Sequence, residues 1–393
     1  MRRLTHPARP GWPARVESVG LPHHTAGDGA PYWDETASYV LSAAEVDVLE
    51  EATTELHRLC LRAVGHVVAE GRWAELAIPA AAAPLVERSW RAGPGGAPDP
   101  TLYGRFDLAY DGRSPPRLLE YNADTPTALV EAAVAQWYWL QEVDPAGDQF
   151  NAIHERLVAA WPAVARRGSA PNGSARPGPA GPVHFASADD AEDVATVAYL
   201  RDTAEQAGLA TRQLLMADVG WDAARRRFVD LDGAVIDLAF KLYPWEWMTR
   251  EAFGAHLVEA AAATRWIEPP WKMVLSNKGI LAILWELFPD HPNLLAASFD
   301  EWRLEAYARK PLLSREGANV SLVMFGDELA RSEGAYGAEG YVYQALAPLP
   351  RFDGRTPVFG SWVVAGEAAG VGVREADGLI TTNTSRFVPH RMA

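Results

Sequence analysis

The stretch LLEYNADTPTALVEAAVAQWYWL, residues 118–140, is the most informative part of the sequence, because its pattern predicts a strand, a polar loop and a helix in succession. Just before it, YGRFDLAYDG at 103–112 resembles a second strand that ends in a turn. The Asp111–Gly112 pair is typical of a hairpin turn, so we predict paired strands over 103–109 and 117–123. Residues 128–143 then predict a helix.

The predicted strand pair gathers polar side chains on one face. Side chains two residues apart on a strand point the same way, so Arg105 and Asp107 share a face, and so do Glu120 and Asn122. Two carboxylates and an amide form a hard-oxygen site of the kind that Mg²⁺ prefers. A neighbouring arginine could stabilise a phosphoryl group in transfer. The alternative is a surface hairpin with ordinary salt bridges, and the residues alone leave both open.

Composition excludes several classes of protein. The chain has 393 residues, 48% hydrophobic and 22% charged, which indicates two or three globular domains. No run of 18 uncharged apolar residues occurs, and no apolar run follows the basic N-terminus, so we expect a cytoplasmic protein without a membrane span. The single cysteine, Cys60, excludes a disulfide framework and a zinc finger. A net charge of −15 argues against broad nucleic-acid binding.

The basic residues are unevenly chosen. Of 36, only four are lysines, and all four lie between positions 241 and 310: Lys241, Lys272, Lys278 and Lys310. In a chain whose basic residues are almost all arginines, a lysine indicates a site that requires a compact ammonium group instead of a planar guanidinium. A nucleotide phosphate site is one example. Chance clustering of four residues is the alternative.

Other segments carry weaker signals. Ser42 and Glu45 form a capping box at the start of an amphipathic helix over 42–70. Residues 1–40 predict loop, residues 167–182 a Gly/Pro/Ser-rich loop or linker, and residues 183–244 a small α/β unit. A short buried helix is expected at 278–288 and mostly strands after 305.

The run from Lys310 to Asn319, with Ser314 and Gly317, could fold over phosphates, although one glycine makes a weak signal. It is not a Walker loop, and no dinucleotide fingerprint follows a strand. Gln344, on a predicted strand, could meet an adenine edge or simply lie at the surface. Glu246, between Trp245 and Trp247, suits an ammonium ligand or stands beside core tryptophans.

Together these residues resemble a known family. LLEYNADTPTALVEAAVAQWYWL with the preceding Arg-x-Asp, FKLYPWE at 240–246, SNKGIL at 276–281 and RKPL at 309–312 are similar to the synthetase domain of the glutathionylspermidine synthase family. The resemblance spans roughly residues 30–390. It implies an α/β (α+β) ATP-grasp fold in permuted order, metal ligands before ATP lysines, with a small pre-ATP-grasp-like domain. The implied division is 1–145, 146–260 and 261–393, with the small domain in the middle.

The resemblance also implies a role for each residue. Arg105 would stabilise the transferring phosphate and the acyl-phosphate intermediate. Asp107, Glu120 and Asn122 would hold Mg²⁺. The remaining roles are ATP binding by Lys278, Lys310, Ser314, Gly317 and Gln344, and substrate contacts by Thr125, Thr127 and Glu246. Thr127 could equally cap the following helix.

The expected function is therefore an ATP- and Mg²⁺-dependent ligase that joins a small carboxylate to a small amine. A nucleotide- or amine-binding protein without activity, or a phosphotransferase, are the alternatives. The N-terminal cysteine amidase domain of bifunctional relatives has no counterpart here, so amide hydrolysis is not expected. The identity of the acid and the amine, and the oligomeric state, do not follow from the sequence.

Overall fold

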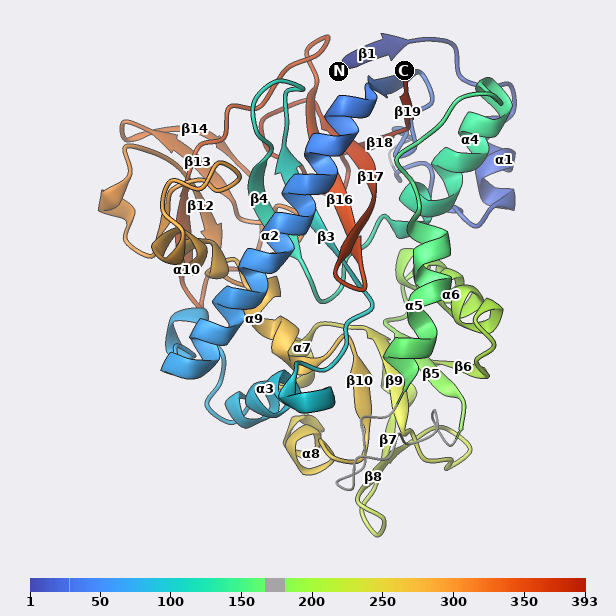
Figure 1. Cartoon of the computed structure of the whole chain (residues 1–393), viewed down its shortest axis with the longest axis vertical. Helices are drawn as coiled ribbons and strands as arrows, with labels where there is room; N and C mark the ends of the chain where they lie inside the picture. Colours follow the sequence, from blue (N-terminus) through green and yellow to red (C-terminus); the bar gives the residue numbers. More distant parts are fainter. Residues whose placement is uncertain (28, 167–180) are drawn as a thin grey trace.

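The computed structural model describes residues 1–27, 29–166 and 181–393 (Figure 1). Most of the loop predicted at 167–182 lies outside the described residues. Within them, no helix is long and apolar enough to cross a membrane. A cytoplasmic location stays a prediction.

The central sheet is antiparallel and joins distant parts of the chain. Its order is β18-β17-β16-β3-β4. Its strands are β3 (Tyr103–Ala109), β4 (Arg117–Asn122), β16 (Thr356–Val364), β17 (Glu367–Ala376) and β18 (Arg386–Val388). The predicted pairing of β3 with β4 is confirmed, with Arg105 opposite Asn122 and Asp107 opposite Glu120.

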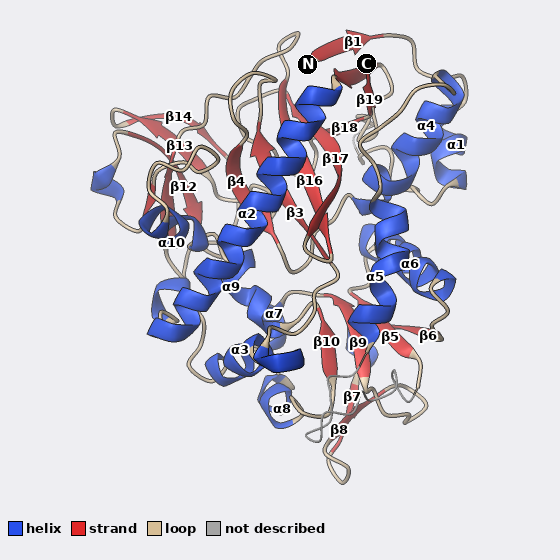
Figure 2. Ribbon diagram, in the orientation of Figure 1, coloured by secondary structure: helices blue, strands red, loops and turns tan. Residues whose placement is uncertain are grey.

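A long helix, α2 (Ala43–Glu70), crosses this sheet (Figure 2). It begins as predicted, because the Ser42 side chain accepts from the Glu45 N–H while Glu45 accepts from the Ser42 N–H. One face of the helix buries Leu49, Leu56 and Val64 in the same core cluster as Phe359 of β16. Burial of this apolar stripe fixes the helix on the sheet.

A second antiparallel sheet packs beside the first, in the order β11-β15-β12-β13-β14 (Figure 1). Its strands are β11 (Ala297–Ser298), β12 (Ala306–Pro311), β13 (Ser321–Met324), β14 (Asp327–Arg331) and β15 (Tyr341–Ala345). Three helices precede it in the chain: α8 (Gly254–Glu259), α9 (Met273–Ser276) and α10 (Ile280–Leu287). Five buried apolar residues of α10 cover the sheet, as the sequence predicted for a short buried helix.

The third sheet is parallel, β10-β9-β5-β6. It consists of β5 (Val183–Ser187), β6 (Thr211–Leu215), β9 (Leu238–Leu242) and β10 (Arg265–Ile267), with a hairpin of β7 (Gly220–Asp222) and β8 (Arg227–Val229) between. Helices α5 (Ile153–Ala165) and α6 (Ala191–Gln206) lie beside it in Figure 1. This is the small α/β unit that the sequence predicted. The three domain limits stay a prediction.

The loop predicted for residues 1–40 is wrong. This segment forms β1 (Arg2–Thr5), α1 (Trp12–Ser18) and β2 (Ala37–Leu41), and β2 lies between β1 and the C-terminal strand β19 (His390–Met392). Strands this short carry little periodicity, and the second partner of β2 lies at the other end of the chain. The remaining helices are α3 (Ala83–Trp90), α4 (Gln136–Val143), preceded by a π-helical turn at Glu131–Ala135, and α7 (Trp245–Met248).

Two buried histidines should make the fold sensitive to acid. Burial lowers the pKa of His57 to about 4 and that of His390 to about 3. Both rings stay neutral in the folded protein while the unfolded chain takes up protons below about pH 6.5. Stability is therefore fully present above that pH and is lost as the pH falls, by about 2 kcal/mol for each histidine between pH 6.5 and 5. Urea denaturation at several pH values measures the free energy of unfolding. This free energy should fall less steeply with decreasing pH in His57→Gln and in His390→Gln than in the wild type. The control His154→Gln, at a partly exposed position, should keep the wild-type slope.

Candidate active site

One cavity collects most of the residues that the sequence singled out. It encloses about 1190 Å³ of empty space open to solvent and is bordered by strands of the central and second sheets. Ten of the twelve candidate residues line it: Arg105, Asp107, Glu120, Asn122, Thr125, Thr127, Lys278, Lys310, Gly317 and Gln344. Ser314 and Glu246 do not line it but contact residues that do.

The proposed metal ligands lie within hydrogen-bond distance of one another. The Asn122 Nδ2 donates to Asp107 Oδ2 at 3.2 Å and to Glu120 Oε1 at 3.1 Å. Arg105 donates two hydrogen bonds to the Asp107 carboxylate, from Nε to Oδ1 at 2.7 Å and from Nη2 to Oδ2 at 3.2 Å. The strand register explains the cluster, because opposite residues on neighbouring strands present their side chains on one face. The structure thus brings these residues together, and a metal at this place stays a prediction.

Charges set the protonation of the two acids. Burial raises the pKa of Asp107, and the Arg105 guanidinium opposes that rise without cancelling it. Burial acts on Glu120 too, but the ammonium groups of Lys278 and Lys310 outweigh it and lower the pKa of Glu120 to about 2. Glu120 is therefore an anion throughout the physiological range.

The two lysines converge on this site although 32 positions separate them. Lys278 Nζ lies 2.8 Å from Glu120 Oε2 and donates to the Ser314 carbonyl at 2.6 Å. Lys310 Nζ donates to the Leu119 carbonyl at 2.8 Å. Burial lowers the pKa of Lys310 to about 8, with the charge of Lys278 adding to the effect. Two cations on one wall of a cavity suit a polyanionic ligand.

Gln344 holds Lys310 in place. Its Oε1 accepts from Lys310 Nζ at 2.7 Å, and its Nε2 donates to the Leu118 carbonyl at 2.8 Å. Both ends of the amide are therefore engaged inside the protein, so an adenine would have to share or replace one of these bonds. Contact of Gln344 with adenine stays a prediction.

The lining also includes a wall of apolar side chains that the sequence did not predict. Such a surface fits the flat face of a base. The residues are Leu119, Ala308, Val320, Leu322, Leu346, Leu349 and Val358. They come from strands of both antiparallel sheets and from the segments that flank those strands. No local sequence pattern indicates that they line one cavity.

The loop after Lys310 packs tightly against the C-terminal region. Gly317 has φ of +67°, and a Cβ there would lie 2.3 Å from the Thr381 carbonyl oxygen. A larger residue at 317 is therefore excluded by contact as well as by backbone conformation. Ser314 donates its hydroxyl to the Pro311 carbonyl at 3.3 Å and turns its own carbonyl to Lys278.

The loop at 123–127 is fixed by a buried ion pair. Lys241 Nζ lies 2.6 Å from Asp124 Oδ1, both side chains fully buried, and the Trp245 N–H donates to Asp124 Oδ2 at 3.0 Å. Arg105 donates to the Thr127 carbonyl as well. These contacts attach the loop to the parallel sheet on one side and to the central sheet on the other.

Arg315 is a candidate site residue that the sequence analysis missed. It donates to the Thr125 hydroxyl, and its Nη2 lies 2.7 Å from Glu246 Oε1. Burial raises the pKa of Glu246, but Arg315 outweighs it and keeps the pKa below its usual range. Arg374 also lines the cavity, from β17. In a chain rich in arginine, neither residue stands out by type, and only the fold brings them to the site.

The comparisons with known proteins agree with this geometry. Residues 3–393 match the family described as glutathionylspermidine synthase preATP-grasp. A Haemophilus influenzae protein named "Putative acid--amine ligase" is 39% identical over 99% of each chain. The chain belongs to the glutathionylspermidine synthase family. It is an ATP-dependent ligase of the class that forms C–N bonds, as the sequence predicted.

Other relatives are longer. The trypanothione synthetase of Crithidia fasciculata is 30% identical over 86% of this chain, which spans 54% of that relative. The bifunctional glutathionylspermidine synthetase/amidase of Escherichia coli is 28% identical over 89% of this chain, which spans 58% of that protein. Among solved structures, a glutathione synthetase-like effector from Globodera pallida in its apo form aligns with a TM-score of 0.55 at 11% identity, covering 97% of this chain and 96% of that one. The fold is thus the α/β ATP-grasp fold of glutathione synthetase-like proteins, as expected.

If Lys310 binds phosphate, its replacement should weaken nucleotide binding. We expect Lys310→Ala to raise the dissociation constant for ATP about tenfold or more, because one charge-assisted contact is lost. Lys310→Arg should bind poorly too, since a guanidinium does not fit the contacts made by the ammonium. Isothermal titration calorimetry measures both. The neighbour Arg309 points to the other face of β12, so Arg309→Ala serves as the matched control. Unchanged affinity in Lys310→Ala would remove this lysine from the ATP site.

Proposed function

We propose that this protein joins a small carboxylic acid to a small amine by way of an acyl phosphate. The observation that supports this most is the meeting of Arg105, the Asp107–Glu120–Asn122 cluster and the buried lysines on the walls of one cavity. ATP would transfer its γ-phosphoryl group to the carboxylate, and ADP would be the leaving group. The neutral amine would then attack the acyl carbon, the bond to the phosphate oxygen would break, and the amine proton would pass to the departing phosphate as the amide forms.

The acidic cluster fits a magnesium ion. Carboxylate and amide oxygens are the donors that Mg²⁺ takes. One oxygen of Asp107 and one of Glu120 already lie around the Asn122 Nδ2, and the Asn122 side chain would turn its oxygen to the ion. A bound Mg²⁺ would neutralise phosphate charge as the phosphoryl group moves. A magnesium ion bound to Glu120 would replace contacts that Lys278 and Asn122 make with this carboxylate.

Arg105 is the group best placed to act on the transferred phosphoryl group. It lies on the cavity wall, buried, and its guanidinium is oriented by the ion pair of Nε with Asp107 Oδ1 at 2.7 Å. Phosphoryl transfer spreads negative charge over three equatorial oxygens, and a fixed guanidinium stabilises that charge without reorganisation. Lys278 and Lys310 would hold the phosphates, and the apolar wall would take the base.

The substrates would meet at the loop 123–127. Thr125 and Thr127 line the cavity and offer hydroxyl groups for the acid. The Glu246 carboxylate, which is paired with Arg315, would contact the amine substrate. The ammonium group of that substrate would compete with the Arg315 guanidinium for the carboxylate. In this arrangement Arg315 is free to turn toward the carboxylate of the acid substrate.

A screen for ADP release decides between this function and its alternatives. The protein would be incubated with ATP and Mg²⁺ and with pooled amino acids, small peptides and polyamines. Release that requires both an acid and an amine supports the ligase. Release that needs no amine, with a phosphorylated product, points to a phosphotransferase, and ATP binding with no release in any pool points to a binding protein.

The reaction should depend on Arg105 and not on cysteine. Arg105→Ala should lower kcat about a thousandfold while changing the KM for ATP much less, because the contact strengthens in the transition state. Arg105→Lys should recover part of the rate. Cys60 is fully buried within α2, and burial raises the pKa of its thiol, so Cys60→Ala should keep nearly full activity. Steady-state kinetics measures all three. Abolished turnover in Cys60→Ala would contradict activation by ATP and point to an acyl-enzyme.

A further inference from the structure

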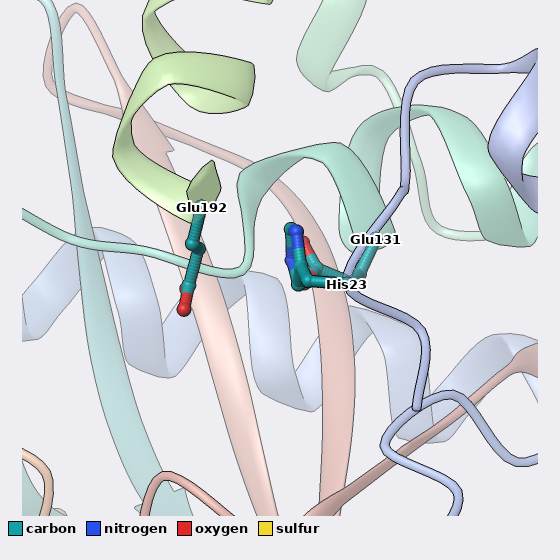
Figure 3. Close-up of side chains that lie close together, drawn as sticks. All are labelled: His23, Glu131 and Glu192. Carbon is teal, nitrogen blue, oxygen red and sulfur yellow. The ribbon is translucent and has the colours of Figure 1, made fainter. Parts of the chain in front are cut away.

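A second polar cluster adjoins the cavity, because Glu192 is hydrogen-bonded to the lining residue Thr127, and it lies where three segments meet. His23 comes from the N-terminal segment after α1, Glu131 from the π-helical turn before α4, and Glu192 from the first turn of α6 (Figure 3). One ligand atom from each residue lies within 4.8 Å of the others. The proposed function uses none of the three.

The imidazole of His23 lacks a partner on one side. Its Nε2 lies 3.1 Å from Glu131 Oε1, whereas its Nδ1 is buried and has no hydrogen-bond partner among the described residues. The Glu131 side chain is only 1% exposed and also accepts from the Tyr32 hydroxyl. A histidine with an unpartnered ring nitrogen, next to a buried carboxylate, offers the two kinds of donor that a zinc ion takes.

The charges of the cluster do not balance. Burial raises the pKa of Glu192, and the charge of Glu131 adds to that rise. Among residues 1–27, 29–166 and 181–393, no lysine or arginine forms an ion pair with either glutamate. Burial opposes protonation of His23, but the hydrogen bond to Glu131 outweighs it, raising the pKa of His23 and lowering that of Glu131. This pairing leaves the partly buried Glu192 carboxylate without a cationic partner of its own among the described residues, and a bound cation would compensate its charge.

We propose that His23, Glu131 and Glu192 bind a divalent transition-metal ion, for which Zn²⁺ is the best match. Zinc accepts one histidine nitrogen and carboxylate oxygens in a tetrahedral set, with water in the remaining position. Ligand atoms in such a set are about 3.4 Å apart. The spacing in the cluster reaches 4.8 Å at most. Rotation of the Glu192 side chain, which lies at the start of its helix and is only partly buried, closes the difference.

The donor set distinguishes this site from the acidic cluster in the cavity. Mg²⁺ and Ca²⁺ prefer six or more oxygen donors, and an imidazole nitrogen is a poor donor for both. Asp107, Glu120 and Asn122 offer oxygen only, so the two sites should take different ions. A zinc ion at His23 would tie the N-terminal segment to the turn that follows the substrate loop and to α6.

Calorimetry on metal-depleted full-length protein tests the site. ZnCl₂ would be titrated in excess MgCl₂ and without ATP, so that the magnesium cluster is occupied and ligase activity has no part in the result. We expect one zinc ion per chain. Binding should weaken about tenfold or more in His23→Ala and in Glu192→Gln, and it should be unchanged in His24→Ala, the neighbouring histidine that instead faces Glu17.

Thermal unfolding gives a second readout. Zinc should raise the Tm of wild type and of His24→Ala, because a ligand that binds only the folded state stabilises it, and it should not raise the Tm of His23→Ala. If His23→Ala does not fold, the zinc affinity of Glu192→Gln is sufficient to test the proposal. Absence of zinc binding by the wild type, or equal binding by wild type and Glu192→Gln, overturns the proposal. Neither result bears on the ligase reaction, which is measured separately by ADP release.

Discussion

The register between β3 and β4 is the constraint on which the site depends. It places Arg105 opposite Asn122 and Asp107 opposite Glu120, so that four polar side chains share one face of a buried sheet. A shift of β4 by one residue would turn Glu120 and Asn122 to the other face, toward the apolar core beneath α2, and would separate them from Arg105 and Asp107. The strands are held in this register from outside as well, because β16 pairs along β3 from Tyr103 to Leu108.

The buried charges explain why the site is so densely cross-linked. An isolated ion removed from water costs several kcal/mol, so each must find a partner inside the protein. Arg105 pairs with Asp107, Lys278 with Glu120, and Lys310 lies between the Leu119 carbonyl and the Gln344 amide. These internal contacts occupy the groups that ATP and Mg²⁺ would use. Ligand binding at this place therefore exchanges partners instead of exposing bare charges.

The four lysines follow the same physical rule. Each is at most 8% exposed, and each donates to a carboxylate, a carbonyl or an amide oxygen inside the protein. Two of them lie at the cavity. The other two have structural partners, since Lys241 fixes Asp124 and Lys272 pairs with Glu268 at 2.7 Å. The retention of lysine in an arginine-rich chain thus marks buried cation sites, of which only part belong to the proposed ATP site.

The sequence by itself determined the local elements and the family. The hairpin of β3 and β4, the capped helix α2 and the candidate residues from Arg105 to Asn122 follow from short-range patterns of alternation, capping and spacing. The resemblance added the fold and the reaction class, both of which the comparisons support.

Only the tertiary structure decided which residues meet across long distances. Arg315 contacts Thr125, 190 positions away in the sequence, and Glu246, 69 positions away, and β2 pairs with β19 at the other end of the chain. Likewise, His23, Glu131 and Glu192 lie far apart along the chain and share no motif. Local pattern carries no record of such contacts, because they arise from the packing of sheets and helices whose relative positions are set by the whole core.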